Sequence, residues 1–456
     1  MANSYLSKTP SSAGNRRTFT FSTWLKRGSN FGSEMGIFTG GDDANATGFF
    51  TFYITTNDRI DAHFWNGSSF DSVTPNTVLR DPAAWYHLVC AVDTTQSTAS
   101  DRIKIYINGE LQTSMYSTDY PDLNHEFNVN HTSIMQVGVR RNGSGALAGY
   151  FDGYMSHAVL VDGAALTAAS FGETDSTSGI WKFKNPSGIT FGTNGFHLKF
   201  ENSAALGTDS SGNSNTYTVN GNLVQSVDTP SNVFCTMNPI VSNRSGFTFS
   251  NGNLTVNTPS TSGSAANMGV NQGKWYFECL INTLGNFYGG WQDLDNQASN
   301  TNSYMVDGCV ATNNGPDIYY GTSSSSANSM NGMAQGDYIG FAIDVPNLKC
   351  WWSRNGQWYT ADSATPTTLT RAQVSANNNG FDLTTGSEMN STSTIAPYMG
   401  TSTAATNNSF NFGAGIFGTT KLTGTTYTDD NGVGIFKYEP PAGFRAICTK
   451  NINTYG

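Results

Sequence analysis

The stretch TFTFSTWLK, residues 18–26, decides the fold class of this chain. Phe19, Phe21 and Leu25 fall on one face of an extended segment, and mostly small polar residues fall on the other. This period of two is typical of a half-buried β-strand. Trp24 is the exception, because it is a large apolar residue on the polar face. The stretch therefore predicts a strand with one face in a hydrophobic core.

Comparable runs recur along the whole chain and are separated by turn dipeptides such as Asn66-Gly67 and Asn108-Gly109, which enter positive φ at low cost. Only residues 164–170 look helical. Many antiparallel strands without intervening helices predict an all-β fold of two antiparallel β-sandwiches. The further expected strands are 48–54, 60–65, 85–93, 103–108, 133–139, 150–161, 246–250, 274–281, 287–292, 338–344, 348–354 and 395–399.

The composition agrees with this fold and excludes two other classes. The chain has 456 residues, of which 49 are Gly, 28 Phe, 20 Tyr and 9 Trp. A disordered chain would be rich in charge and poor in aromatic residues, whereas here only 12% of residues are charged. The net charge of −10 also disfavours nucleic acid as a partner, because gripping its backbone requires a surplus of Lys and Arg.

Two similar units indicate two domains. In each, an apolar strand ending in Asp is followed by a second strand and an Asn-Gly reversal, over residues 86–109 and 338–356. This describes adjacent inner strands of a sandwich, although hairpin physics favours Asn-Gly in any antiparallel sheet. We expect sandwiches at 1–200 and 241–418, a connecting segment at 201–240, and a tail at 419–456 that packs on a sandwich or a partner.

Neither a membrane span nor a secretory signal is expected. No window approaches the ~18 to 20 consecutive apolar residues that cross a bilayer, which predicts no membrane insertion. The first eight residues lack a charged region followed by an apolar one, so a complete gene product would be made in the cytoplasm and remain there or leave by another route. Six scattered cysteines without a C-x-x-C pair favour buried free thiols over a disulfide framework.

Two sets of motifs carry a resemblance to known families. Residues 1 to about 200 resemble a laminin-G-like (concanavalin A-like) jelly roll, and residues from about 240 to 418 resemble a SPRY domain. The resemblance implies two sandwiches of these types. The motifs of the first are FTFSTWLKR (19–27), WYHLV (85–89), IYING (105–109) and FDGY (151–154); those of the second are GKWYFEC (273–279), GDYIGFAID (336–344), WSRNG (352–356) and SFNFG (409–413).

The opening YLSKTPSSAGNRR, residues 5–17, is similar to the start of laminin-G-like proteins of tailed bacteriophages. This similarity implies a virion surface protein that is assembled in the host cytoplasm, in a tail fibre, a tail appendage or a head fibre. Its partners would be other phage virion proteins. Fibre proteins are mostly trimeric, so we expect a homo-oligomer, although no heptad run indicates how its copies would wind together.

No motif indicates catalysis, and we predict that the protein is not an enzyme. The chain has no G-x-S-x-G pentapeptide, no H-E-x-x-H zinc motif and no phosphate-binding glycine loop. Some concanavalin-like sandwiches cleave polysaccharides with an E-x-D-x-E strand, and the nearest match is ETDST, residues 173–177. Thr177 stands where the motif has its third carboxylate, and we expect this segment to be a solvated loop.

Sugar sites in lectin-like sandwiches combine an aromatic face with Asn and Asp side chains that bind hydroxyl groups. Each aromatic residue has core packing as its alternative role. For Asp42 and Asp43, calcium coordination by carboxylate oxygens is the alternative to a polar turn, and no other cofactor is expected. The candidate ligand-binding residues are Trp65, Asn66, Trp291, Asp293, Tyr319 and Tyr320.

The sequence thus leads to two hypotheses about function. The first is an adhesion or recognition module of a bacteriophage virion that contacts host-surface glycans. The alternative is a non-catalytic structural protein that decorates or cements the capsid or joins tail components, because polar sandwiches can bury ~1,000 Å² against neighbours without specialised residues.

Overall fold

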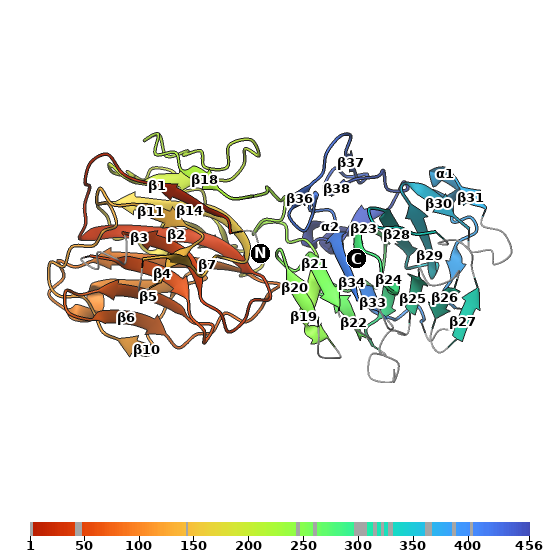
Figure 1. Ribbon diagram of the computed structural model, residues 1–456, viewed down its shortest axis with the longest axis horizontal. Helices are drawn as coiled ribbons and strands as arrows, with labels where there is room; N and C mark the ends of the chain where they lie inside the picture. Colours follow the sequence, from red (N-terminus) through yellow and green to blue (C-terminus); the bar gives the residue numbers. More distant parts are fainter. Residues whose placement is uncertain are drawn as a thin grey trace. The chain divides into compact units, whose positions relative to one another are not determined.

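The computed structural model describes residues 3–41, 48–142, 145–242, 247–258, 262–295, 308–312, 317–320, 323–326, 332–360, 367–384, 389–401 and 405–456. The chain divides into two compact units, Met1–Gln225 and Ser226–Gly456, and strands make up nearly all of the regular secondary structure in each (Figure 1). In the described part of the chain, one strand pair is parallel and all other named pairs are antiparallel. The predicted all-β sandwich fold is confirmed.

Unit 1 consists of two sheets that pack face to face around one core, in which Phe21 of one sheet stacks on Phe38 of the other at a ring distance of 4.4 Å. The eight-stranded sheet has the order β10 (Met115–Thr118), β6 (Phe70–Pro75), β5 (Ile60–Trp65), β4 (Phe50–Ile54), β3 (Met35–Gly40), β11 (Met135–Val137), β1 (Tyr5–Lys8) and β18 (Thr218–Asn220). The six-stranded sheet has the order β17 (Phe196–Leu198), β14 (Gly153–Asp162), β2 (Thr18–Arg27), β7 (Trp85–Asp93), β8 (Ile103–Ile107) and β9 (Glu110–Leu111).

A covering segment explains why Trp24 breaks the alternation of β2. Trp24 lies on the outer face of the six-stranded sheet, stacks on His87 at 4.7 Å and is only 4% exposed. The outer face is covered by residues 164–191, which include the hairpin β15 (Gly172–Thr174) and β16 (Trp181–Phe183). The helix expected over 164–170 is a single 3-10 turn, Ala168–Ser170, and the first two residues of the loop expected over 173–177 belong to β15.

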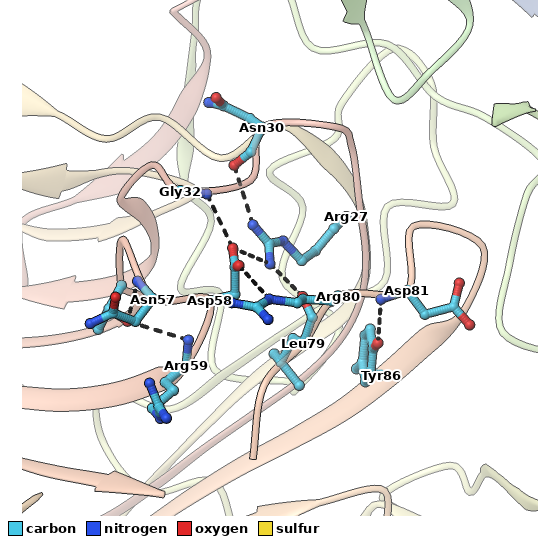
Figure 2. A network of polar contacts seen from close by, with 11 residues as sticks. Arg27, Asn30, Gly32, Asn57, Asp58, Arg59, Leu79, Arg80, Asp81 and Tyr86 are labelled. Atoms are coloured by element: carbon cyan, nitrogen blue, oxygen red, sulfur yellow. Dashed lines mark hydrogen bonds and ion pairs between the residues drawn. The ribbon is translucent and has the colours of Figure 1, made fainter. Parts of the chain in front are cut away.

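At the end of β2, one buried carboxylate joins segments that are distant in sequence (Figure 2). Asp58 Oδ1 accepts a hydrogen bond from Arg27 Nη1 at 3.1 Å, and its Oδ2 accepts one from Arg80 Nε at 2.8 Å. The amide of Gly32 also donates to Asp58, and the Arg27 guanidinium donates to the carbonyl oxygen of Leu79. Burial alone would raise the pKa of Asp58, but these hydrogen bonds lower it.

Unit 2 is a second pair of sheets, and Phe277 of one sheet packs edge-on against Trp291 of the other at 5.0 Å. The repeated unit seen in the sequence forms neighbouring antiparallel strands in both units, as predicted. The seven-stranded sheet has the order β19 (Met237–Ser242), β22 (Ser262–Ala266), β33 (Ile395–Thr401), β24 (Phe287–Asp293), β25 (Gly308–Thr312), β26 (Asp317–Tyr320) and β27 (Ser323–Ser326).

The other sheet of unit 2 has ten strands. Its main order is β20 (Thr248–Ser250), β21 (Thr255–Thr258), β34 (Thr406–Asn411), β23 (Lys274–Thr283), β28 (Tyr338–Asp344), β29 (Lys349–Arg354), β30 (Gln357–Tyr359) and β31 (Thr368–Leu369), with β32 (Phe381–Asp382) beside β29 and β39 (Arg445–Ala446) beside β23. Two short helices, α1 (Arg371–Ser375) and α2 (Thr449–Tyr455), complete the unit.

The division between the units falls inside the expected connecting segment 201–240, and the expected tail packs on the second sandwich, which is one of its two predicted positions. Residues 218–220 form β18 of unit 1, whereas Phe234 lies in the core of unit 2. The C-terminal segment, residues 414–456, places Phe436, Phe444 and Cys448 in that same core. The second sandwich therefore includes the chain from residue 226 to its last residue.

Two further expectations concern helices and thiols. Within the described ranges, no helix has the length and apolar character needed to cross a membrane. The five cysteines whose side chains are described are all buried thiols outside any disulfide, as the scattered spacing predicted: Cys90, Cys235, Cys279, Cys350 and Cys448.

Candidate functional site

The outer surface of the eight-stranded sheet presents a group of polar and aromatic side chains on β4, β5 and β6. Ile60, Ala62 and Phe64 of β5 point into the core, so the residues between them point outward. Antiparallel register then pairs Trp65 with Phe70 across β5 and β6. We call this group the β5–β6 face; it consists of Tyr53, Asp61, His63, Trp65, Phe70, Ser72 and Thr74.

A hairpin covers the centre of the same sheet, but it does not cover the β5–β6 face. The hairpin pairs β12 (Arg140–Arg141) with β13 (Leu147–Ala148). Thr39 donates a hydrogen bond to the carbonyl oxygen of Val139, and Arg141 donates one to Gln136 at 3.0 Å. Thr39 and Gln136 are therefore fully buried, whereas Phe70 is 40% exposed.

Phe70 is the centre of an aromatic platform. Its ring stacks on His63 at 5.1 Å with an angle of 11° between the planes, and Trp65 meets it edge-on at 4.9 Å. Phe49, which is buried, supports it from a third side at 6.1 Å. Three neighbours thus fix the orientation of an aromatic ring that stays accessible, as a stacking site for a ligand requires.

Asp61 lies in the same face but is only 4% exposed. Thr74 donates a hydrogen bond to it at 2.9 Å, and Tyr53 is a second hydrogen-bond partner. Burial raises the pKa of Asp61 to about 7, although both hydrogen bonds lower it. Burial also lowers the pKa of His63, whose Nδ1 lies 4.0 Å from Asp61, so His63 is neutral at pH 7.

Of the predicted residues, Trp65 and Asn66 lie here, but they have different roles. Trp65 is part of the platform. The Asn66 side chain closes the turn between β5 and β6, because its oxygen accepts from the amides of Ser68 and Ser69 at 2.9 Å and its nitrogen donates to Asp71. Phe70 was not predicted, because only the pairing of β5 with β6 places it beside Trp65.

The structure does not support Trp291 and Asp293 as ligand contacts. Trp291 is 1% exposed and packs in the core of unit 2. Asp293 is 1% exposed, and its carboxylate accepts hydrogen bonds from the Ser393 hydroxyl at 2.5 Å and from the Asp295 amide at 2.9 Å. Both faces of β24 are covered, which the alternation of its sequence did not reveal.

For the remaining predicted residues, the structure describes at most the backbone. Tyr319 and Tyr320 belong to β26, where their backbones pair with β27 and their side chains are not described. Asp42 and Asp43, the predicted calcium ligands, lie outside the described residues.

A second polar cluster in unit 1 looks like a nucleophile and its base, but its protonation excludes that chemistry. The Ser22 hydroxyl oxygen lies 2.9 Å from His87 Nε2. Trp181 Nε1 can only donate, and it donates to His87 Nδ1 at 3.0 Å. Nδ1 is therefore unprotonated and Nε2 carries the proton, which it donates to Ser22. Burial lowers the pKa of His87 to about 3, so this imidazole cannot take the serine proton.

Acid is expected to destabilise unit 1. Burial lowers the pKa of His87 to about 3 and those of His157 and His197, whose ring nitrogens are 3.1 Å apart, to about 4. Between about pH 6.5 and 4, these three histidines bind protons in the unfolded chain but stay neutral in the folded protein. Asp61, whose pKa is raised in the fold, has the opposite effect and offsets one of these protons. The free energy of unfolding of unit 1 should therefore decrease as the pH is lowered from about 6.5 to 4. Urea titrations at several pH values would measure this decrease.

Histidine ring signals in the NMR spectrum give a direct check of this expectation. The ring of His87 should show no titration above about pH 4 while the protein stays folded. A titration of His87 near pH 6.5 in the folded state would contradict it.

Comparisons with known proteins found one family and several solved structures that are similar to all or part of this chain. No curated protein sequence matches the chain. Among solved structures, the SPRY domain of human HERC1 is 11% identical, with 38% of this chain and 96% of that chain covered and a TM-score of 0.28. Domains LG4-5 of the mouse laminin alpha1 chain are 8% identical, with 96% and 94% covered and a TM-score of 0.28.

A pentraxin from Limulus polyphemus is 15% identical, with 36% of this chain and 71% of that chain covered and a TM-score of 0.27. The family described as the concanavalin A-like lectin/glucanases superfamily matches residues 2–171, which include the whole β5–β6 face. Residues 2–171, most of unit 1, are therefore similar to this concanavalin A-like superfamily.

Proposed function

We propose that the protein is a bacteriophage virion surface protein that recognises host-surface glycans, and that it binds them on the β5–β6 face of unit 1. The observation that carries this proposal is the platform of Phe70, Trp65 and His63, because it holds an accessible ring in a fixed orientation on a sheet face. An aromatic ring of this kind stacks on the apolar C–H surface of a sugar.

Polar groups beside the platform fit the hydroxyl groups of a sugar. His63 is neutral at pH 7 and can donate or accept through Nε2, and Ser72 is its cross-strand neighbour. Asp61 is the single carboxyl group among the seven residues of the face, and it is almost completely buried. Glycoside hydrolysis uses two carboxyl groups on either side of the scissile bond. The face therefore fits binding better than cleavage, and we propose a non-catalytic role.

The virion setting rests on the resemblance of residues 5–17 to the start of phage laminin-G-like proteins. In that setting the protein would lie in a tail fibre, tail appendage or head fibre, as a homo-oligomer joined to other virion proteins. Electron microscopy of intact particles would locate it. A position buried between capsid or tail subunits, away from the outer surface, would contradict the recognition role and favour the structural alternative.

Removing the platform is expected to weaken binding to host glycans by about tenfold for each of Phe70→Ala and Trp65→Ala, which corresponds to about 1.4 kcal/mol. The reason is the loss of one stacking surface on the sugar. Binding of the full chain to glycan arrays and to whole host cells would measure the effect. Ile180→Ala is the control, because Ile180 is 66% exposed in the hairpin of β15 and β16, which covers the other sheet.

Two results would overturn the proposal. One is a wild-type protein that binds no host glycan and no host cell. The other is binding that Phe70→Ala and Trp65→Ala leave unchanged while both variants remain folded.

A further inference from the structure

Unit 2 contains a cleft of about 420 Å³, which lies in the size range of small-molecule sites, ~300 to 1,000 Å³. One wall comes from β30, β31 and the first residue of α1, and the other comes from the C-terminal segment (Figure 1 labels these elements). The side chains used below are Gln357, Trp358, Arg371, Tyr427, Tyr438 and Glu439.

The aromatic residues of the cleft are held in place by the fold. Trp358 of β30 is 3% exposed and forms part of the core beneath the cleft. Tyr427 belongs to β37 (Tyr427–Thr428) and pairs with the buried Phe436 of β38 (Ile435–Phe436). Tyr438 is fixed through its backbone amide, which donates to the buried Glu278 at 2.8 Å. Two tyrosine rings are thus presented on a rigid support.

A glycine allows Tyr438 to close this wall. Gly356 has a φ of +82°, and a Cβ atom built there would lie only 2.5 Å from Cδ1 of Tyr438. The ring of Tyr438 therefore packs directly on the backbone of the turn between β29 and β30. This close packing shows that the cleft is part of the folded unit rather than a gap between loosely placed segments.

The polar groups of the cleft carry no net charge. Arg371 pairs with Glu439 and also donates to the carbonyl oxygen of Pro440 at 3.3 Å. The hydroxyl groups of Tyr427 and Tyr438 make no hydrogen bond to another described residue, so they can bind a ligand. The side-chain nitrogen of Gln357 donates hydrogen bonds to the carbonyl oxygens of Trp358 and Leu369. The side-chain oxygen of Gln357 remains as an acceptor for a ligand.

We infer that this cleft is a second carbohydrate site, specific for neutral oligosaccharides, and that the protein binds glycans through both of its units. Aromatic rings suit the apolar faces of sugars, and the phenol and amide groups suit their hydroxyls. The internal Arg371–Glu439 pair leaves no free charge for an ionic ligand. An extended peptide fits less well, because β31 at the cleft is only two residues long and offers little edge for strand addition.

The inference rests on the proposed function, since both sites take the same class of ligand, so the test has to separate them. The full chain is titrated with malto-, cello-, laminari- and manno-hexaose as neutral probes, and with sialyllactose and an extended acidic peptide as contrasts. Four proteins are compared: the wild type, Phe70→Ala, Tyr427→Ala and the double variant. Saturation-transfer NMR and calorimetry report binding and stoichiometry.

We expect Phe70→Ala to retain binding of a neutral hexaose and the double variant to lose it at least tenfold. Tyr427→Phe, which keeps the ring, should weaken binding less than threefold, and Gly356→Ala should weaken it by displacing Tyr438. Thr428→Ala is the matched control, because Thr428 is the exposed neighbour of Tyr427 in β37. Thermal unfolding would show that each variant keeps unit 2 folded.

The outcomes distinguish the two sites. Loss of all binding with Phe70→Ala alone would overturn the second site and leave the proposed function intact. Loss with Tyr427→Ala alone, with no effect of Phe70→Ala, would support the cleft and overturn the β5–β6 face. The cleft would be overturned as a neutral-sugar site if Phe70→Ala still bound and neither Tyr427→Ala nor Gly356→Ala reduced that remaining binding. Binding of only sialyllactose or only the peptide would overturn it as well. Binding of none of the probes would count against the cleft as well.

Discussion

Asp58→Asn is expected to lower the free energy of unfolding of unit 1 by about 3 to 5 kcal/mol. Asp58 is the ionic partner of Arg27, whose side chain is completely buried (Figure 2). The variant keeps the shape of the side chain but leaves the guanidinium charge uncompensated away from water. For a unit of about 200 residues this corresponds to a melting temperature lower by roughly 6 to 20 °C.

The second partner of the same carboxylate provides a matched control. Arg80 also pairs with Asp58, but 63% of its side chain is exposed. Exposed ion pairs contribute about 0 to 1 kcal/mol, so Arg80→Ala should have a small effect. Urea denaturation followed by hydrogen exchange of amides in β2 and β5 would measure both variants on unit 1 alone.

A double variant separates the cost of an unpaired charge from the loss of packing. Arg27→Met combined with Asp58→Asn removes both charges and keeps an apolar side chain in the site, so it should recover most of the stability lost in Asp58→Asn. If the double variant were no more stable than Asp58→Asn, or if Arg80→Ala were equally destabilising, the buried pair would not be the main contribution at this corner.

The apolar runs in the sequence were sufficient to predict the bounds of several strands. β5, β7 and β28 have the bounds expected from the sequence, and β2 is one residue longer. Alternation fails where a third layer covers a sheet. Trp24 violates the pattern of β2 because residues 164–191 lie over it, and nothing within β2 itself indicates this cover.

The extent of the second sandwich was less predictable than its strands, because it depends on contacts between residues that are distant in sequence. The segment after residue 418 has few strand-like runs, and its place in unit 2 is set by single hydrogen bonds and by side chains such as Phe436 and Phe444. One signal was present in the sequence. Glu278 is an acidic residue between large apolar residues in a strand, and such a residue has to be paired with donors from elsewhere in the fold.

The candidate site was predicted only in part for a similar reason. Trp65 was found because an aromatic residue beside an Asn-Gly turn is visible in the sequence. Phe70 requires the register of β5 against β6, and Trp291 requires knowledge that both faces of β24 are covered. A sequence pattern shows which residues share a face of one strand, but it does not show whether another layer covers that face.

Glu278→Ala is expected to destabilise unit 2 by about 3 to 5 kcal/mol and to loosen the C-terminal segment. Glu278 is completely buried, and its two oxygens accept four hydrogen bonds. The amides of Lys437 and Tyr438 donate at 2.9 and 2.8 Å, and the side chains of Tyr276 and Asn411 supply the other two. Its removal takes this acceptor away from all four donors and also creates a cavity in the core.

Hydrogen exchange gives the most direct measurement of this effect, because two of the donors are backbone amides. The amides of Lys437 and Tyr438 should lose protection in Glu278→Ala, and proteases should cleave the C-terminal segment faster. Tyr276→Phe is the graded control, since it removes one of the four donors and should cost about 1 kcal/mol. Unchanged protection of both amides would show that the apolar contacts of the segment alone hold it on the sheet.

The pH dependence of unit 2 tests the same carboxyl group without changing the sequence. Burial raises the pKa of Glu278 to about 7, even though the amides and the side chains that donate to it lower it. A carboxyl group whose pKa is higher in the fold than in the unfolded chain contributes stability that is present below about pH 4.5 and is lost as the pH rises through 7. Unit 2 should therefore become less stable between pH 5 and 8, and this slope should disappear in Glu278→Ala. A slope that persists in the variant would assign the dependence to another group.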